Sequence, residues 1–152
     1  MALDDDILFL RRIPTFRVLG PDALRVLAIS TEKIHLRLGD TLFEEGEPSD
    51  CAYVVIAGAI RLRSAKDKPL DELQVVRGGA LIGESALIIE NLRGATAIAL
   101  EPSTLYRITR AVFLRMLESD VEAADALRGM IARRIDAALD DLDVVLPRFE
   151  PQ

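Results

Sequence analysis

The region from about residue 31 to residue 108 constrains the fold most, because it consists of short apolar segments interrupted by glycines. The segments are rich in Val, Ile, Leu and Thr. The glycines stand at positions 39, 46, 58, 78, 79, 83 and 94. Residues 34–38 and 59–63 alternate apolar and polar side chains, which predicts strands with one buried face. Many short strands with frequent turn residues are typical of a small β-barrel or jelly roll.

Both ends of the chain predict helices. The first thirty residues show helical spacing that is interrupted at Pro14 and resumes at Pro21, a residue favoured at helix starts. Helical spacing returns at Arg110, and a longer helical stretch is predicted over about residues 121–145. One apolar face of that stretch carries Leu127, Ile131, Ile135, Ala138 and Leu142. This face covers the chain's own barrel, joins two copies of the chain as a homodimer, or does both.

Composition limits the possible functions. A chain of 152 residues, half of them apolar, can bury one core, which predicts a single domain. The net charge of −6 argues against a nucleic-acid partner. One cysteine and one histidine provide no transition-metal site, so Cys51 is predicted to be a small core residue and His35 a strand residue near the surface. The acidic residues 4–6 do not resemble a signal peptide, and no apolar run is long enough for a membrane span, so we expect a cytoplasmic protein.

One short stretch predicts an anion site. Gly83 precedes residues 84–89, which predict a short helix whose first N–H groups are exposed. Arg93 follows, and a guanidinium group suits phosphate oxygens. A carboxylate only accepts hydrogen bonds, so the natural partner of Glu84 beside a phosphate is a sugar hydroxyl. A ribose phosphate fits this pair, although Glu84 and Arg93 could instead form an ordinary surface ion pair.

The residues Gly83-Glu84-Ser85-Ala86-Leu87 and Arg93-Gly94-Ala95-Thr96 resemble the phosphate-binding cassette of the cyclic nucleotide-binding domain family. Residues 39–50 and 53–58 resemble the turn and the strand that precede the cassette in that family, so the resemblance covers about residues 30–115. It implies a mainly β domain with flanking α-helices. N-terminal helices would occupy residues 1–30, and an eight-stranded β-roll or jelly-roll barrel would occupy residues 31–109. The cassette would occupy residues 83–96 and C-terminal helices residues 110–146.

The resemblance also implies roles for individual residues. Arg93 would neutralise an equatorial oxygen of the cyclic phosphate, and Glu84 would accept a bond from the ribose 2′-hydroxyl. Backbone N–H groups of Gly83, Ala86 and Gly94 would donate to the ligand. The full set of expected ligand-binding residues is Gly83, Glu84, Ser85, Ala86, Arg93, Gly94 and Ala95.

The ligand implied by the resemblance is cyclic AMP. Family members that prefer cyclic GMP often carry a threonine or serine directly after the arginine, whereas this chain has Gly94, so cyclic GMP stays a second possibility. Glycine is itself a departure from the usual residue there. The chain also departs from the family pattern at Ala80, Ile82 and Leu92, none of which supplies a ligand-contacting group. No metal is implied.

The expected function is a stand-alone cyclic nucleotide sensor, or a piece of a longer protein. A helix-turn-helix module would need roughly sixty further residues. The ligand would draw the cassette inward and reposition the C-terminal helices, which would relay occupancy to a protein partner. Two alternatives stay open: a ligand-independent dimerisation module, and a sensor of another nucleotide such as a cyclic dinucleotide. An enzyme is not expected, since no nucleophile stands with a base in any motif.

Overall fold

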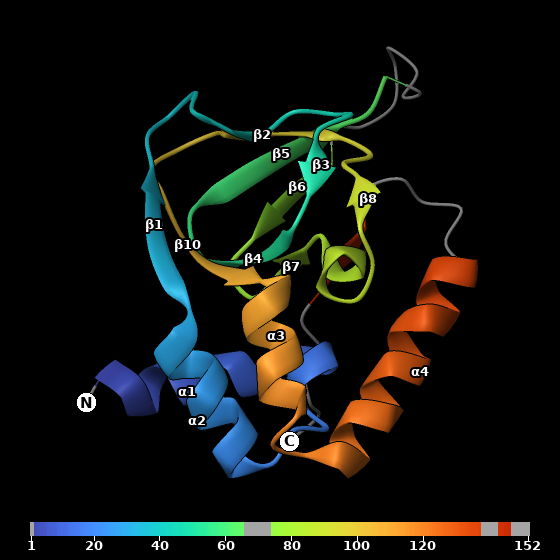
Figure 1. The fold of residues 1–152 in the computed structure, drawn as a ribbon. Coiled ribbons are helices and arrows are strands. Elements are labelled where there is room, and N and C mark those ends of the chain that lie inside the picture. Colours follow the sequence, from blue (N-terminus) through green and yellow to red (C-terminus); the bar gives the residue numbers. More distant parts are fainter. Residues whose placement is uncertain (1, 66–73, 138–142, 147–152) are drawn as a thin grey trace, which may run out of the picture.

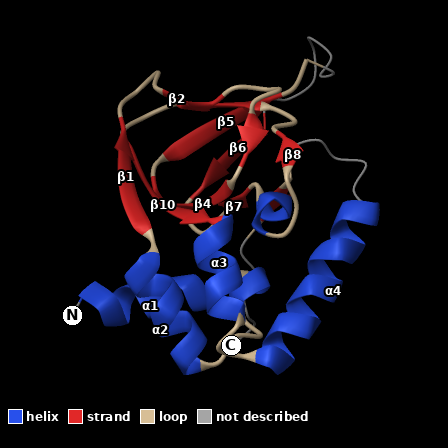
Figure 2. Ribbon diagram, viewed as in Figure 1, coloured by secondary structure: helices blue, strands red, loops and turns tan. Residues whose placement is uncertain are grey.

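The computed structural model describes residues 2–65, 74–137 and 143–146. It shows a β-roll with helices gathered at one end (Figures 1 and 2). The N-terminal part contains α1 (Ala2–Arg11), the 3₁₀ helix η1 (Pro14–Phe16) and α2 (Pro21–Ser30). The fold class predicted from the sequence, mainly β with flanking helices, is confirmed.

Within the described residues, ten strands lie between α2 and α3, and an eleventh follows α4 in the sequence. Their bounds are β1 (Glu32–Leu36), β2 (Thr41–Phe43), β3 (Pro48–Ser49), β4 (Cys51–Ala57), β5 (Ala59–Arg63), β6 (Gln74–Arg77), β7 (Leu81–Ile82), β8 (Asn91–Leu92), β9 (Thr96–Ala99), β10 (Ser103–Thr109) and β11 (Val144–Val145). They form sheets in the orders β1-β10-β4-β7-β11, β2-β9-β5-β6 and β3-β8. Every pairing is antiparallel, as expected for a roll without crossover helices.

Two apolar clusters hold the domain together. One fills the roll and includes Phe43, Tyr53 and Ile60, whereas the other joins the base of the roll to the helices. Cys51 lies in the first cluster with 2% of its surface exposed, as predicted for a core residue. His35 is exposed on β1, also as predicted.

The predicted strand over residues 34–38 is displaced by two residues, because β1 ends at Leu36. The cause is a turn that starts at Arg37. The N–H group of Arg37 donates to the Asp40 carboxylate at 2.8 Å, and the N–H group of Asp40 donates to the Arg37 carbonyl at 3.0 Å. Gly39 has a positive φ of 89° within this turn. The strand predicted over residues 59–63 is confirmed as β5.

The C-terminal helices are α3 (Arg110–Leu117) and α4 (Val121–Ala137). Leu127 and Ile131 of the predicted apolar face are fully buried in the cluster shared with α1, α2 and α3, so this part of the face covers the chain's own domain. The Ile135 side chain, Ala138 and Leu142 lie outside the described residues. The predicted helical stretch is wrong at its end, because residues 144–145 form β11 and pair with β7.

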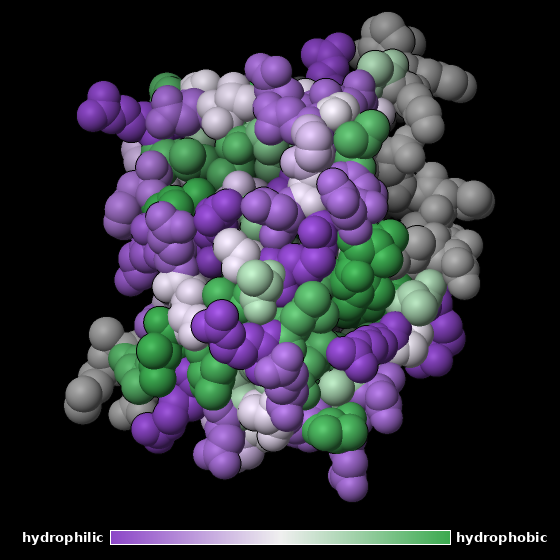
Figure 3. Space-filling view, viewed as in Figure 1, coloured by the Kyte–Doolittle hydropathy of each residue, from purple (hydrophilic) through white to green (hydrophobic). Residues whose placement is uncertain are grey.

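The surface mixes apolar and polar side chains. In the view of Figure 3 an apolar area lies beside β8. Ile89, which precedes β8, and Leu92, which lies in it, are 42% and 64% exposed. None of the described helices is both long and apolar enough to cross a bilayer. The same described residues contain no group of three or more His, Cys, Asp or Glu side chains that could hold a metal ion.

Candidate functional site

Gly83 connects β7 to the 3₁₀ helix η2 (Glu84–Leu87), which is the predicted cassette helix. Its φ of 82° lies in the left-handed region, which glycine adopts without a steric penalty. A Cβ atom at this position would lie 2.5 Å from Nη1 of Arg93. Gly83 is therefore needed both for the backbone turn and for the space that the arginine occupies. The structure thus brings together two of the predicted site residues.

The Arg93 side chain is buried, with 8% of its surface exposed. Its Nη2 donates to the Cys51 carbonyl at 2.8 Å and to Cys51 Sγ at 3.3 Å. The guanidinium carbon lies 4.4 Å from the centre of the Phe43 ring and 5.6 Å from that of Tyr53. Aromatic faces attract cations, so both rings hold the guanidinium group in place.

No ion pair joins Arg93 to a carboxylate within the described residues. The surface ion pair with Glu84, considered as an alternative above, is therefore wrong, and both side chains are buried rather than on the surface. A buried cation is costly unless an opposite charge accompanies it. The arrangement suits an anion arriving from solution.

The Tyr53 phenol beside Arg93 is neutral at physiological pH. Burial, as the largest cause, and a hydrogen bond with Cys51 together raise the pKa of Tyr53 to about 12. The positive charge of Arg93 acts in the opposite sense but is a smaller influence on this pKa. Tyr53 therefore supplies an aromatic face and a hydroxyl to its surroundings and no negative charge.

Glu84 is 2% exposed, and its carboxylate accepts a hydrogen bond from the Thr15 hydroxyl of η1. The predicted ribose-binding residue is thus tied to the N-terminal helices. The sequence contains no signal for this contact, because Thr15 lies 69 positions away and belongs to no recognisable motif. The role of Glu84 toward a ribose hydroxyl stays a prediction.

Ser85 and Gly83 both donate to Asp143, a residue that sequence reasoning missed. The Ser85 N–H group lies 3.1 Å from Oδ2 of Asp143, and the Ser85 hydroxyl also donates to that oxygen. The Gly83 N–H group donates to the Asp143 carbonyl at 2.8 Å. Asn91 completes the cluster by donating to the Ser85 hydroxyl oxygen at 2.7 Å. The predicted donor N–H of Gly83 and the N–H of Ser85, a predicted ligand-binding residue, are therefore both occupied by the chain itself.

Arg110, the first residue of α3, holds the cassette from the other side. Its Nε donates to the Ala86 carbonyl at 2.8 Å, and its Nη2 donates to the carbonyls of Ser49 at 2.6 Å and Ile89 at 3.0 Å. The N–H group of Ala86 donates within the turn to the Gly83 carbonyl at 3.1 Å. Arg110 thus links α3 to the C-terminal end of the cassette helix, to the segment after it and to β3. No motif in the sequence indicated this role.

Gly94 and Ala95 lead from Arg93 into β9. Gly94 is half-buried and Ala95 is 2% exposed, so neither adds a side chain that could donate to a ligand. The Arg93 backbone is fixed on both sides, because its N–H group donates to the Glu47 carbonyl at 2.7 Å and its carbonyl accepts from Gly46 at 2.8 Å. The glycine-rich turn before β3 therefore positions the arginine.

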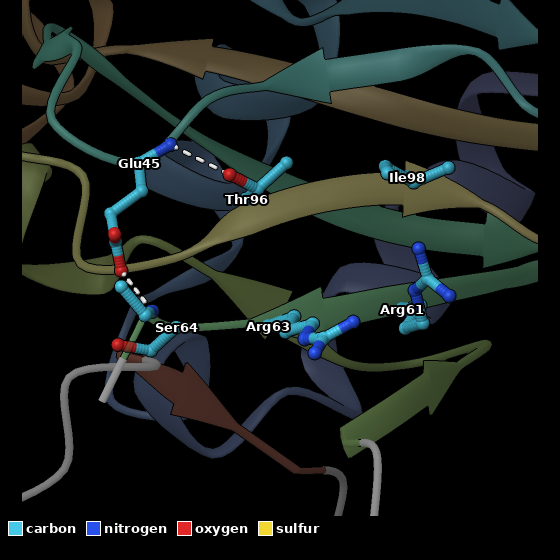
Figure 4. Close-up of a pocket in the computed structure, with 7 residues that line it drawn as sticks. Glu45, Arg61, Arg63, Ser64, Thr96 and Ile98 are labelled. Carbon is cyan, nitrogen blue, oxygen red and sulfur yellow. Dashed lines mark hydrogen bonds between the residues drawn. The ribbon is translucent and has the colours of Figure 1, made fainter. Parts of the chain in front are cut away.

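A separate pocket of about 260 Å³ lies on the outer face of β5 and β9 (Figure 4). It contains none of the seven predicted ligand-binding residues. Its lining residues are Glu45, Arg61, Arg63, Ser64, Ala65, Thr96 and Ile98. Strand alternation explains its location, because Ile60 and Leu62 face the core while Arg61 and Arg63 face outward.

Comparison with known proteins identifies the family of the chain. The model of the cyclic nucleotide-binding domain family matches residues 33–120, more than half of the chain. A cyclic nucleotide-binding-like protein from Brucella abortus shares 38% identity at a TM-score of 0.67, covering 76% of this chain and 99% of that one. The N-terminal domain of a transcriptional regulator from Streptomyces coelicolor shares 36% identity at a TM-score of 0.73, covering 85% and 91%.

A relative from Thermus thermophilus named cyclic AMP receptor protein is 28% identical over 138 residues, which are 90% of this chain. The chain spans only 63% of the length of that relative. The match of the family model agrees with the observed roll of antiparallel sheets. The chain belongs to the cyclic nucleotide-binding domain family.

Proposed function

We propose that this domain binds cyclic AMP at the cassette and reports its occupancy to a protein partner through the C-terminal helices. The observation that carries the proposal is Arg93, a buried cation held by two aromatic rings and a carbonyl and unpaired with any carboxylate of the described residues. A cyclic phosphate carries one negative charge and matches this site. The domain acts by binding, without catalysing a reaction.

Each of the predicted ligand-binding residues has a task in this proposal. Arg93 binds the phosphate, and N–H groups of Gly83, Ser85, Ala86 and Gly94 supply further hydrogen bonds. Glu84 accepts from the ribose 2′-hydroxyl in place of, or in addition to, the Thr15 hydroxyl. Ala95 leaves space for the ligand because its side chain is small. Gly94 offers no hydroxyl to a guanine amino group, which favours cyclic AMP over cyclic GMP.

The proposed relay of ligand occupancy depends on the elements that contact the cassette. The cassette helix contacts β4, α3 and α4, and α4 lies beside it in Figure 1. A ligand shifts such contacts only if it binds one arrangement more tightly than another. Such a difference in affinity arises if the ligand phosphate displaces Asp143 from the N–H groups of Gly83 and Ser85. The name of the Thermus relative, cyclic AMP receptor protein, supports the choice of ligand.

Calorimetric titration with cyclic AMP and cyclic GMP tests the proposal. We expect saturable binding, tighter for cyclic AMP, and a loss of roughly 2–5 kcal/mol for Arg93→Ala because a charged partner is removed. Arg63→Ala is the matched control, because it removes an exposed arginine from the outer pocket and leaves the cassette intact. Its affinity should equal that of the wild type.

The remaining outcomes separate the alternatives. Equal affinity of wild type and Arg93→Ala would remove the phosphate-site assignment. No binding of either nucleotide by folded protein, free of co-purified ligand, would favour the ligand-independent module. Resonances of α4 that do not move at saturating nucleotide would contradict the relay. A Glu84→Ala variant that still distinguishes cyclic AMP from its 2′-deoxy analogue would contradict the ribose contact.

A further inference from the structure

The segment 143–145 follows α4 in the sequence and lies against the cassette. Asp143 accepts hydrogen bonds from Gly83 through its carbonyl and from Ser85 through its carboxylate. Val144 and Val145 form β11, which pairs antiparallel with β7, the strand that leads directly into Gly83. The same three residues thus contact both the backbone donors of the cassette and the strand that positions them.

We propose that residues 143–145 are an internal ligand of the cassette that competes with the cyclic nucleotide. The inference rests on the proposed function, because it concerns the same site. In this proposal the C-terminal segment takes the place of the phosphate. It offers an anionic oxygen to Ser85 and a second hydrogen-bond acceptor to Gly83. Nucleotide and segment cannot both take these N–H groups.

The chemistry of Asp143 fits this role. Its carboxylate oxygen accepts from both the N–H and the hydroxyl of Ser85, as an anionic phosphate oxygen would. Its backbone φ of 53° is in the left-handed region, which aspartate adopts more readily than most residues with side chains. This local turn lets one residue present its carbonyl to Gly83 and its carboxylate to Ser85.

The two valines anchor the segment by side-chain alternation. Val144 packs against the cluster inside the roll, which contains Phe43 and Tyr53, the rings that flank Arg93. Val145 packs against the cluster shared with the helices. Both valines are only half-buried, and the next residue, Leu146, is 55% exposed. Two paired residues form a short anchor, so docking can be reversed by a ligand.

Nucleotide binding would therefore release the segment and leave the edge of β7 without its strand partner. The apparent Kd for the nucleotide is the intrinsic Kd divided by the fraction of molecules in which the segment is undocked, so docking weakens the apparent affinity. A variant that undocks the segment recovers that lost affinity. The protein thus reports ligand occupancy by the position of its own C-terminal segment.

The test uses the full chain and two variants that undock the segment differently. Asp143→Asn removes the anionic acceptor but tolerates the left-handed backbone, and Val144→Asp removes the apolar anchor. Asp125→Asn is the matched control, because it removes an exposed carboxylate from α4. We expect cyclic AMP to bind both undocking variants roughly 3–10-fold more tightly than the wild type, and the control within about twofold. Val144→Asp adds a negative charge, which repels the anionic nucleotide. Electrostatics alone therefore predicts weaker nucleotide binding for this variant, whereas undocking of the segment predicts tighter binding.

Amide hydrogen exchange by NMR gives an independent measurement. In the free wild type the amides of Gly83 and Ser85 should be protected, and Asp143→Asn should lower the protection of Ser85. At saturating cyclic AMP, the resonances of residues 143–146 should move toward those of an unstructured chain. Wild-type affinity in both undocking variants, with residues 143–146 unchanged at saturation, would overturn the inference and leave the proposed function standing. Absence of nucleotide binding in the wild type and both variants would overturn the proposed function itself.

Discussion

Replacement of Gly83 by alanine is expected to weaken nucleotide binding by moving Arg93. The new Cβ would lie 2.5 Å from Nη1 of Arg93, whereas ordinary contact begins near 3.4 Å, so the guanidinium group must move by about 1 Å. That movement strains the 2.8 Å bond to Cys51 and the stacking on Phe43. We expect a loss of roughly 1–3 kcal/mol of binding, or about 5–150-fold in affinity for cyclic AMP.

Gly39→Ala is the matched control for this variant. Gly39 has a φ of 89°, close to the 82° of Gly83, but a Cβ atom there would meet nothing within 4 Å. Both substitutions place alanine in the left-handed region and should cost about 1–2 kcal/mol of stability each. For a domain of this size the melting temperature should fall by roughly 2–8 °C in both. Calorimetry and thermal unfolding measure the two effects, and equal affinity of the two variants for cyclic AMP would refute the reasoning.

Two further predictions concern the support of the site and its pH dependence. Arg110→Ala removes the hydrogen-bond donors to the carbonyls of Ser49, Ala86 and Ile89. Urea unfolding should therefore show a free energy of unfolding lower by roughly 1–3 kcal/mol, with partial recovery in Arg110→Lys. An unchanged unfolding midpoint would contradict the positioning role of Arg110. Burial raises the pKa of Tyr53 to about 12, and burial together with the hydrogen bond to Asp6 raises the pKa of Tyr106. Because both pKa values lie above the unfolded value near 10, the neutral phenols stabilise the folded state fully below pH ~10, and each contribution is lost as the pH rises through the folded-state pKa of that tyrosine. Tyrosinate absorbance should therefore stay low in folded protein at pH ~10.5 and rise on unfolding in urea, and ionisation of both phenols near pH 10 in the folded state would be the contrary result.

Local patterns in the sequence were sufficient for most of the architecture. The alternation of apolar and polar residues over positions 59–63 predicted β5, and the short apolar segments separated by glycines predicted the roll. Both patterns work because strand period and turn geometry depend on neighbouring residues. The spacing from Gly83 to Arg93 indicated an anion site for the same reason. What this spacing did not reveal is that both residues are buried and nearly in contact.

Tertiary structure decided which groups complete the cassette. Thr15 donates a hydrogen bond to Glu84, 69 positions away in the sequence, and Ser85 donates to Asp143, 58 positions away. No periodic pattern in the sequence extends over such separations. Residues 144–145 continue a helical apolar spacing, yet they form a strand, because β7 offers backbone partners and both clusters offer apolar contacts. By itself the sequence determined most strands and turns and predicted the anion-binding residues, since these depend on local geometry and residue chemistry. Which oxygens reach the cassette depends on long-range packing, and only the folded chain settles that.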